Sequence, residues 1–112
     1  MQHLKGSKTE QNLMTALQGE SVARNKYTFF AQVAKEAGLE QIAGIFLETA
    51  DNERAHAEKL AKFLGLVGDT QANLQAAAEG ERYEHSQMYP EFEKVAREEG
   101  FTEIAEFFKE VA

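Results

Sequence analysis

One stretch of four residues, Glu53-Arg54-Ala55-His56, lies in the middle of a predicted helix that runs from Leu39 to Leu64. The apolar residues of this helix recur with an alternating three–four spacing, which places them on one stripe of its surface. Glu53 and His56 fall on the same stripe, on the face that should pack into the core. A carboxylate and an imidazole are costly to bury unless something pairs them. A metal ion would pair them if other carboxylates lie at the same depth.

The composition is that of a single all-α domain. The chain has 112 residues, with alanine, glutamate, leucine, lysine and glutamine prominent, one proline and no run of alternating apolar residues. Its net charge of −7 argues against binding to nucleic acid, which requires a basic face. There is no cysteine, which excludes disulfides and cysteine-ligated metals in this chain. No apolar stretch reaches the roughly 20 residues that cross a bilayer, and the first residues show no secretion signal, so we expect a cytoplasmic protein without membrane contact.

Capping signals divide the chain into four predicted helices. The first begins after Gly6, with Ser7 and Glu10 as a capping box, and ends near Gly38. The second ends near Gly65. The third runs from Asp69 or Thr70 to about Glu99 and contains Pro90, which should kink it or deform one turn. The fourth begins at about Phe101 and continues to the last residue, Ala112.

The two halves of the chain repeat each other. Gly19-Glu20 corresponds to Gly80-Glu81, and residues 37–43 correspond to residues 99–105, with an offset that is one residue longer. Two helices in each half predict a four-helix bundle with approximate internal two-fold symmetry. The counterparts of Glu53 and His56 would be positions 115 and 118. We therefore expect residues 1–112 to be one domain that is cut within its fourth helix.

Three more acidic residues lie on predicted inward stripes. Glu20 lies on the stripe of the first helix, and Glu81 and Glu84 lie on that of the third. Together with Glu53 and His56 they give five candidate metal ligands near the middle of their helices. Hard oxygen ligands with an imidazole suit iron or manganese. Bridging carboxylates can hold two such ions, and an inward Glu beside a Glu-x-x-His helix is a known arrangement for this in bundles.

Each of these signals also has a structural explanation. Glu-x-x-His is a short pattern that is usually a solvated pair, and Glu20 could pair with Arg24 one turn away. Glu81 and Glu84 could belong to a solvated acidic face. Tyr27 is more typical of a core aromatic than of a catalytic group. The coincidence of four acids and one histidine at matching depth on three helices, in two repeats, favours a metal site.

Several stretches make the chain resemble the rubrerythrin family over its whole length. These stretches are residues 4–13, 19–27, 45–53, 73–74, 76–78, 80–81, 88–90 and 96–101. The resemblance implies a ferritin-like di-iron protein that reduces hydrogen peroxide to water in the cytoplasm. It implies that Glu20, Glu53, His56, Glu81 and Glu84 are ligands of two iron ions, with manganese or zinc as possible substitutes and Glu53 as the bridging carboxylate. It also implies that Tyr27 donates a hydrogen bond to a ligand carboxylate.

Two features of the family are absent from these 112 residues: the second Glu-x-x-His and a cysteine-rich rubredoxin domain. Electron transport to the irons is therefore expected to need an external donor such as a rubredoxin-type protein. Two other functions remain open. The same ligands would serve a ferroxidase or iron-storage protein of the ferritin type, and a metal-free helical oligomerisation module would use none of them.

The connection between the second and third helices is short. In a ferritin-like bundle these helices run parallel, so the connection must cross the length of the bundle. A helix of about 26 residues is roughly 39 Å long, whereas residues 65–69 extend over only about 16 to 18 Å. We therefore expect a homodimer in which two chains exchange helix pairs and each site draws ligands from both. An up-down-up-down monomer would also accept the short connection.

Overall fold

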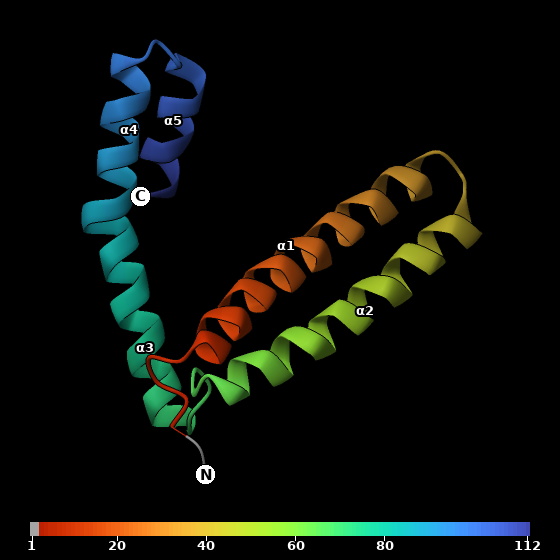
Figure 1. Ribbon diagram of the computed structural model, residues 1–112. Coiled ribbons are helices and arrows are strands. Elements are labelled where there is room, and N and C mark those ends of the chain that lie inside the picture. The colour runs from red at the N-terminus through yellow and green to blue at the C-terminus, as the bar shows by residue number, and fades with distance from the viewer. Residues whose placement is uncertain (1–2) are drawn as a thin grey trace. The chain divides into compact units, whose positions relative to one another are not determined.

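The architecture of residues 3–112 comes from a computed structural model and is entirely helical in its regular elements (Figure 1). The elements are α1 (Lys8–Glu36), α2 (Glu40–Phe63), α3 (Thr70–Tyr83), the π-helical turn η1 (Glu84–Met88), α4 (Tyr89–Glu98) and α5 (Thr102–Val111). The described residues contain no strand, which confirms the all-α prediction. The chain divides into two compact units, Met1–Val67 and Gly68–Ala112, which are described separately.

The first unit is a hairpin in which α1 and α2 lie side by side (Figure 1). Ser7 caps its start as predicted, because the Glu10 N–H donates to Ser7 Oγ at 3.0 Å. Glu10 Oε1 accepts from the N–H of Gly6 at 2.9 Å, one residue before the Ser7 N–H that a capping box would use. Its tight turn depends on Gly38, whose φ of +78° is unfavourable for any residue with a Cβ. The Leu39 N–H then donates to the Ala34 carbonyl at 2.8 Å, which closes the end of α1.

Small residues allow the two helices of this hairpin to approach closely. Its buried positions are all alanines: Ala31, Ala34, Ala43 and Ala50. Next to them three aromatic rings form a cluster, with ring centroids 6.1 Å apart for Tyr27 and Phe46, 6.0 Å for Tyr27 and Phe30, and 5.6 Å for Phe30 and Phe46. Aromatic pairs at these separations stabilise the packing beyond the area that they bury.

The second unit begins at Asp69, whose carboxylate accepts from the Ala72 N–H at 2.8 Å and caps α3. The helix then widens into the π turn η1, where the Tyr89 N–H donates to the Glu84 carbonyl five residues earlier. Pro90, which follows directly, has no N–H, and in a regular helix its ring would clash with the carbonyl of Ser86. The predicted deformation near Pro90 is confirmed, and its form is a π turn.

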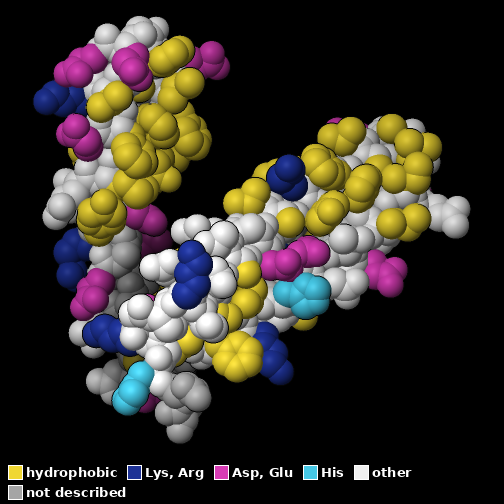
Figure 2. All heavy atoms as spheres, viewed as in Figure 1, with side chains coloured by type: hydrophobic (Ala, Val, Ile, Leu, Met, Phe, Trp, Pro, Cys, Tyr) yellow, Lys and Arg dark blue, Asp and Glu magenta, His cyan; other side chains and the backbone are white. Residues whose placement is uncertain are grey.

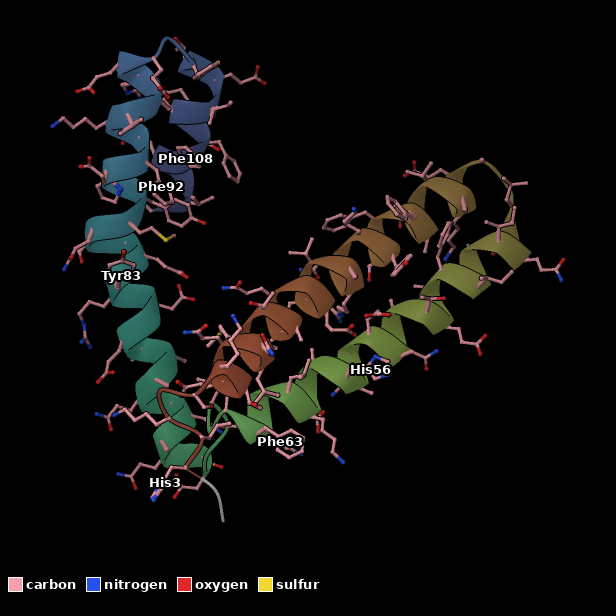
Figure 3. The ribbon with its side chains drawn as sticks, viewed as in Figure 1. His3, His56, Phe63, Tyr83, Phe92 and Phe108 are labelled. Carbon is pink, nitrogen blue, oxygen red and sulfur yellow. The ribbon has the colours of Figure 1, made fainter. Side chains whose placement is uncertain are left out.

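The repeat seen in the sequence is also present in the structure. Tyr89, Phe92 and Phe108 form a cluster with centroid separations of 5.6 to 6.1 Å. Figure 3 labels two of these rings, Phe92 on α4 and Phe108 on α5. Each of the three rings follows its counterpart in the first cluster at the same sequence offset. The turn between α4 and α5 repeats that of the hairpin: Gly100 has a φ of +86°, and the Phe101 N–H donates to the Ala96 carbonyl at 2.8 Å. The two units therefore share one helix–turn–helix plan.

The π turn accounts for the change of offset along the repeat. The offset from Glu20 to Glu81, before the turn, is one residue shorter than the offset from Tyr27 to Tyr89, after the turn. A π turn uses one more residue than an α turn for the same rotation. It thereby absorbs the additional residue and keeps Glu81 and Tyr89 on one face of the helix, as Glu20 and Tyr27 are on α1.

Candidate metal centre

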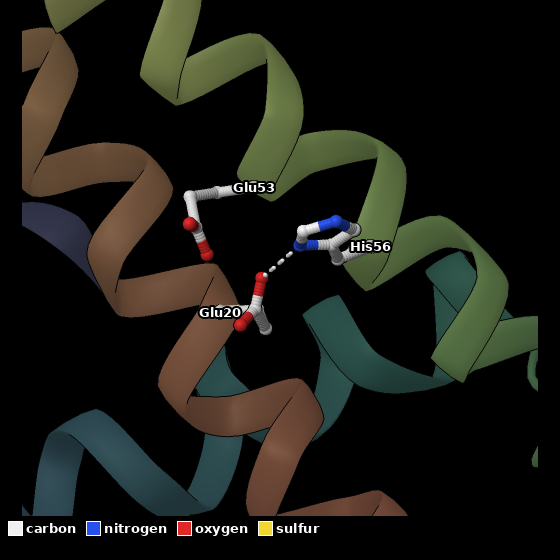
Figure 4. A group of neighbouring side chains, drawn as sticks. All are labelled: Glu20, Glu53 and His56. Atoms are coloured by element: carbon white, nitrogen blue, oxygen red, sulfur yellow. Dashed lines mark hydrogen bonds and ion pairs between the residues drawn. The ribbon is translucent and has the colours of Figure 1, made fainter.

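Three side chains of the hairpin converge about midway along it: Glu20 from α1, and Glu53 and His56 from α2 (Figure 4). One ligand atom of each lies within 4.8 Å of those of the other two. His56 Nδ1 and Glu20 Oε2 are 3.0 Å apart, and the carboxylate accepts the hydrogen bond. Because Glu53 and His56 are three residues apart on one helix, both project toward the same position on α1.

The two carboxyl groups in this cluster influence each other in opposite directions. A hydrogen bond from Glu53, followed by the contact with His56, lowers the pKa of the Glu20 carboxyl below its ordinary value. The hydrogen bond with Glu20, partial burial and the Glu20 charge raise the pKa of the Glu53 carboxyl. The two carboxyl groups therefore lose their protons in succession, Glu20 at lower pH than Glu53. A cation at the same position would neutralise both carboxylates.

This donor set fits a transition-metal ion. Two carboxylates and one imidazole combine hard oxygen ligands with a nitrogen ligand, which suits iron or manganese and also accepts zinc. The cluster is accessible to solvent, because the side chain of His56 is 63% exposed and that of Glu20 is 29% exposed. The expectation that His56 lies in a core is thus wrong for the hairpin itself. On α1 the face toward α2 includes Leu17 and Ala31, whereas Ala16 and Phe30 are exposed.

One of the structural explanations for these residues is excluded. Glu20 pairs with His56 across the hairpin, whereas Arg24, its proposed partner one turn away, donates to Asn25 Oδ1 at 3.2 Å. Tyr27 packs its ring against Phe30 and Phe46, in agreement with its expected behaviour as a core aromatic. Its role as a hydrogen-bond donor to a ligand stays a prediction.

The remaining two predicted ligands belong to the second unit. Glu81 is exposed on α3, and the half-buried Glu84 is the first residue of the π turn. The structure thus brings together three of the five predicted ligands, and the assignment of Glu81 and Glu84 stays a prediction. The π turn itself was not predicted, although the lengthening of the repeat offset by one residue across it was a signal for an insertion.

A repeated two-helix plan with a carboxylate–histidine cluster defines a class of helical, metal-binding proteins. Comparison with known proteins narrows the class: residues 11–112 match the family model for rubrerythrin. Rubrerythrin from Nitratidesulfovibrio vulgaris is 50% identical over 100% of this chain and 65% of its own length, and rubrerythrin from Porphyromonas gingivalis is 49% identical over 97% of this chain and 61% of its own length. The chain belongs to the rubrerythrin family, whose ferritin-like domain is a helical bundle.

The chain spans less than two thirds of the length of these two relatives. Rubrerythrin-1 from Clostridium acetobutylicum, 48% identical over all of this chain, is covered over 66% of its length. Among the helices of residues 3–112, none is long and apolar enough to cross a membrane.

Proposed function

We propose that the chain is the di-iron domain of a rubrerythrin-type peroxidase, which reduces hydrogen peroxide to water with electrons from an external rubredoxin-type donor. The observation that carries this proposal is the cluster of Glu20, Glu53 and His56 in a chain of the rubrerythrin family. We propose Glu81 and Glu84 as further ligands, because the bundle arrangement for two metal ions draws carboxylates from more than one helix pair.

The residues of the hairpin would hold and orient the ions. Glu20 and Glu53 supply negative charge, and the contact of Glu20 with His56 Nδ1 orients the imidazole ring. Two bound irons would supply the two electrons that peroxide reduction requires and would polarise the peroxide oxygens.

The experiment combines metal binding with a reaction. The chain is loaded anaerobically with Fe(II), its iron content is determined, and oxidation by hydrogen peroxide and by oxygen is followed by absorbance. A peroxidase is expected to react faster with peroxide, whereas faster oxidation by oxygen would identify a ferroxidase. Absence of bound iron, with a melting temperature unaffected by a chelator, would identify a metal-free oligomerisation module.

A pair of variants on the same helix tests the ligand assignment. Glu53→Ala is expected to weaken iron binding at least about tenfold, since even hydrogen-bond partners of ligands affect metal affinity by that factor. Glu48→Ala, an exposed glutamate of α2 outside the cluster, is the matched control and should bind iron as the unaltered chain does. Equal iron content in the two variants would refute the assignment.

A further inference from the structure

The connection between α2 and α3 consists of only six residues, Leu64 to Asp69, and most of them are fixed by hydrogen bonds. At its first end, the Leu66 N–H donates to the Ala61 carbonyl at 3.0 Å, which closes α2. At its other end, Gly68 and Asn73 exchange two hydrogen bonds, of 2.8 and 3.0 Å, which belong to the start of α3. Val67 alone lies between these two capping structures.

This connection is too short to cross a helical bundle. The 24 residues of α2 are about 36 Å long. Seven Cα–Cα steps from the last residue of α2 to the first of α3 span at most about 25 Å when fully extended, and reaching that length would break both capping structures. A ferritin-like bundle needs one long crossover connection, so a single chain cannot form this topology by folding back through Leu64–Asp69.

Relatives have additional residues within the matched region. The alignments with the proteins from N. vulgaris and C. acetobutylicum run over 125 and 129 positions, whereas this chain has 112 residues. These relatives therefore carry residues that have no counterpart here. A connection long enough to cross the bundle would require such residues.

Both units expose an apolar surface that is large enough to be buried at an interface. In the second unit a groove between α4 and α5 is lined by Phe92, Val95, Phe101, Ile104 and Phe108, and hydrophobic side chains gather over these two helices (Figure 2). In the first unit the residues at the equivalent positions of the repeat form the matching set: Phe30, Val33, Leu39, Ile42 and Phe46. Phe30 and Val33 are 42% and 67% exposed there. Exposed apolar surface of this kind is typical of an interface.

We propose that a second copy of the chain buries these surfaces. In this arrangement α1 and α2 of one chain form a bundle with the helices from α3 to α5 of its partner, and the dimer contains two such bundles. Two-fold exchange of identical elements satisfies the short connection without strain. Each metal centre would then combine Glu20, Glu53 and His56 of one chain with the partner's Glu81 and the partner's Glu84. The shared centre rests on the proposed function, whereas the exchange itself rests on the connection.

The first experiment measures the mass of the assembly in solution by light scattering. The chain is expected to have twice its single-chain mass of 12.5 kDa. Insertion of about 12 Gly and Ser residues after Val67 lengthens the connection enough to cross the bundle, so this variant should become a monomer with the same helix content. Val67→Gly loosens the connection without lengthening it and should remain a dimer. A monomeric unaltered chain, or an insertion variant that stays dimeric, would overturn the exchange.

The second experiment tests whether two chains share each centre. Glu53→Ala damages the first unit and Glu81→Ala damages the second, so each variant alone has no intact centre. After the two are unfolded together in equal amounts and refolded, half of the dimers should be mixed, and each mixed dimer has one intact and one doubly altered bundle. The mixture should regain about a quarter of the metal bound by the unaltered chain. Metal equal to the mean of the separate variants would refute sharing between chains.

The two experiments separate failure of this inference from failure of the proposed function. The mass and its response to the insertion do not depend on metal. A dimer that the insertion converts to a monomer, but that binds no metal, would support the exchange and refute the di-iron centre. A metal-binding monomer with the short connection would support the centre and indicate an up-down-up-down bundle.

Discussion

The two units follow the same plan but differ in what they add to it. Both have a glycine turn, buried alanines beside it and a three-ring aromatic cluster, at equivalent positions of the repeat. The first unit adds the cluster of Glu20, Glu53 and His56, whereas the second adds the π turn and an ion-pair network around Arg97. The two units thus share their apolar packing and differ in their polar side chains.

The π turn is the difference with the largest expected effect. The π turn absorbs one additional residue, so insertion of one alanine after Ser86 would add a second residue that the turn does not absorb and would rotate Glu81 and Glu84 by about 100° relative to α4. We expect metal binding to weaken at least about tenfold, since the two proposed ligands would leave the face that carries Tyr89. Titration with Fe(II) or Co(II), with circular dichroism to confirm the helix content, measures this effect.

The matched control is Ser86→Ala, which removes only the 2.7 Å hydrogen bond from Ser86 Oγ to the Arg82 carbonyl. This variant should bind metal as the unaltered chain does. If the variant with the inserted alanine is fully helical and also binds metal normally, the face on which Glu81 and Glu84 lie does not matter for binding, and their assignment as ligands fails.

Local signals predicted the helices well because helix ends are decided locally. Ser7, Gly38 and Gly100 set their ends through side-chain capping and positive φ, and both can be read from a few residues. The π turn could not be assigned in the same way. Pro90 predicts a deformation, but its form depends on keeping the residues before and after it on one face.

The sequence predicted which hairpin residues meet at the candidate site, but it did not predict how exposed they are. Helical spacing placed Glu53 and His56 on one face, and the structure brings them to Glu20. Helical spacing did not predict that Leu17 and Ala31 lie on the packed face of α1, because burial depends on which helix packs against which face. His56 is exposed in the hairpin, and the assignment of Glu81 and Glu84 to the site stays a prediction.

The shared aromatic clusters predict equal consequences of equivalent substitutions. Phe46→Ala and Phe108→Ala each remove one ring from a cluster of three. Both rings are half-buried, so we expect each variant to lose about 2 to 3 kcal/mol of unfolding free energy, at or below the lower end for core phenylalanines. For a chain of this size this lowers the melting temperature by roughly 10 °C or more. A loss in one variant more than twice that in the other would show that only one cluster supports the fold.

The ion-pair network of the second unit gives the smallest expected effect. Arg97 donates to Glu93 Oε2 at 2.8 Å and to Glu106 Oε1 at 2.7 Å, which joins α4 to α5. The equivalent positions in the first unit are Lys35, Ala31 and Gly44, which cannot form this network. Comparison of the two units therefore shows how much the ion pairs of Arg97 contribute to the stability of a turn that both units have.

The pH dependence of this contribution follows from the pKa of Glu106. The hydrogen bond and the charge of Arg97 lower the pKa of the Glu106 carboxyl below its ordinary value of 4.5. Because the pKa is lower in the folded state, the pair stabilises the fold at pH values above 4.5, and this stabilisation is lost as the pH falls through the folded pKa. Arg97→Gln should be less stable than the unaltered chain at pH 7, and the difference should shrink at pH 3. The effect is expected to be small and to decrease with salt, since these side chains are exposed to solvent.

Urea unfolding of both proteins at pH 3, 5 and 7 measures this difference, and Lys35→Gln is the control at the equivalent position of the first unit. That control should show no comparable dependence on pH, because Lys35 has no carboxylates at the positions that correspond to Glu93 and Glu106. A difference for Arg97→Gln that persists unchanged at pH 3 would mean that Arg97 stabilises α4 and α5 through packing of its aliphatic part and not through charge.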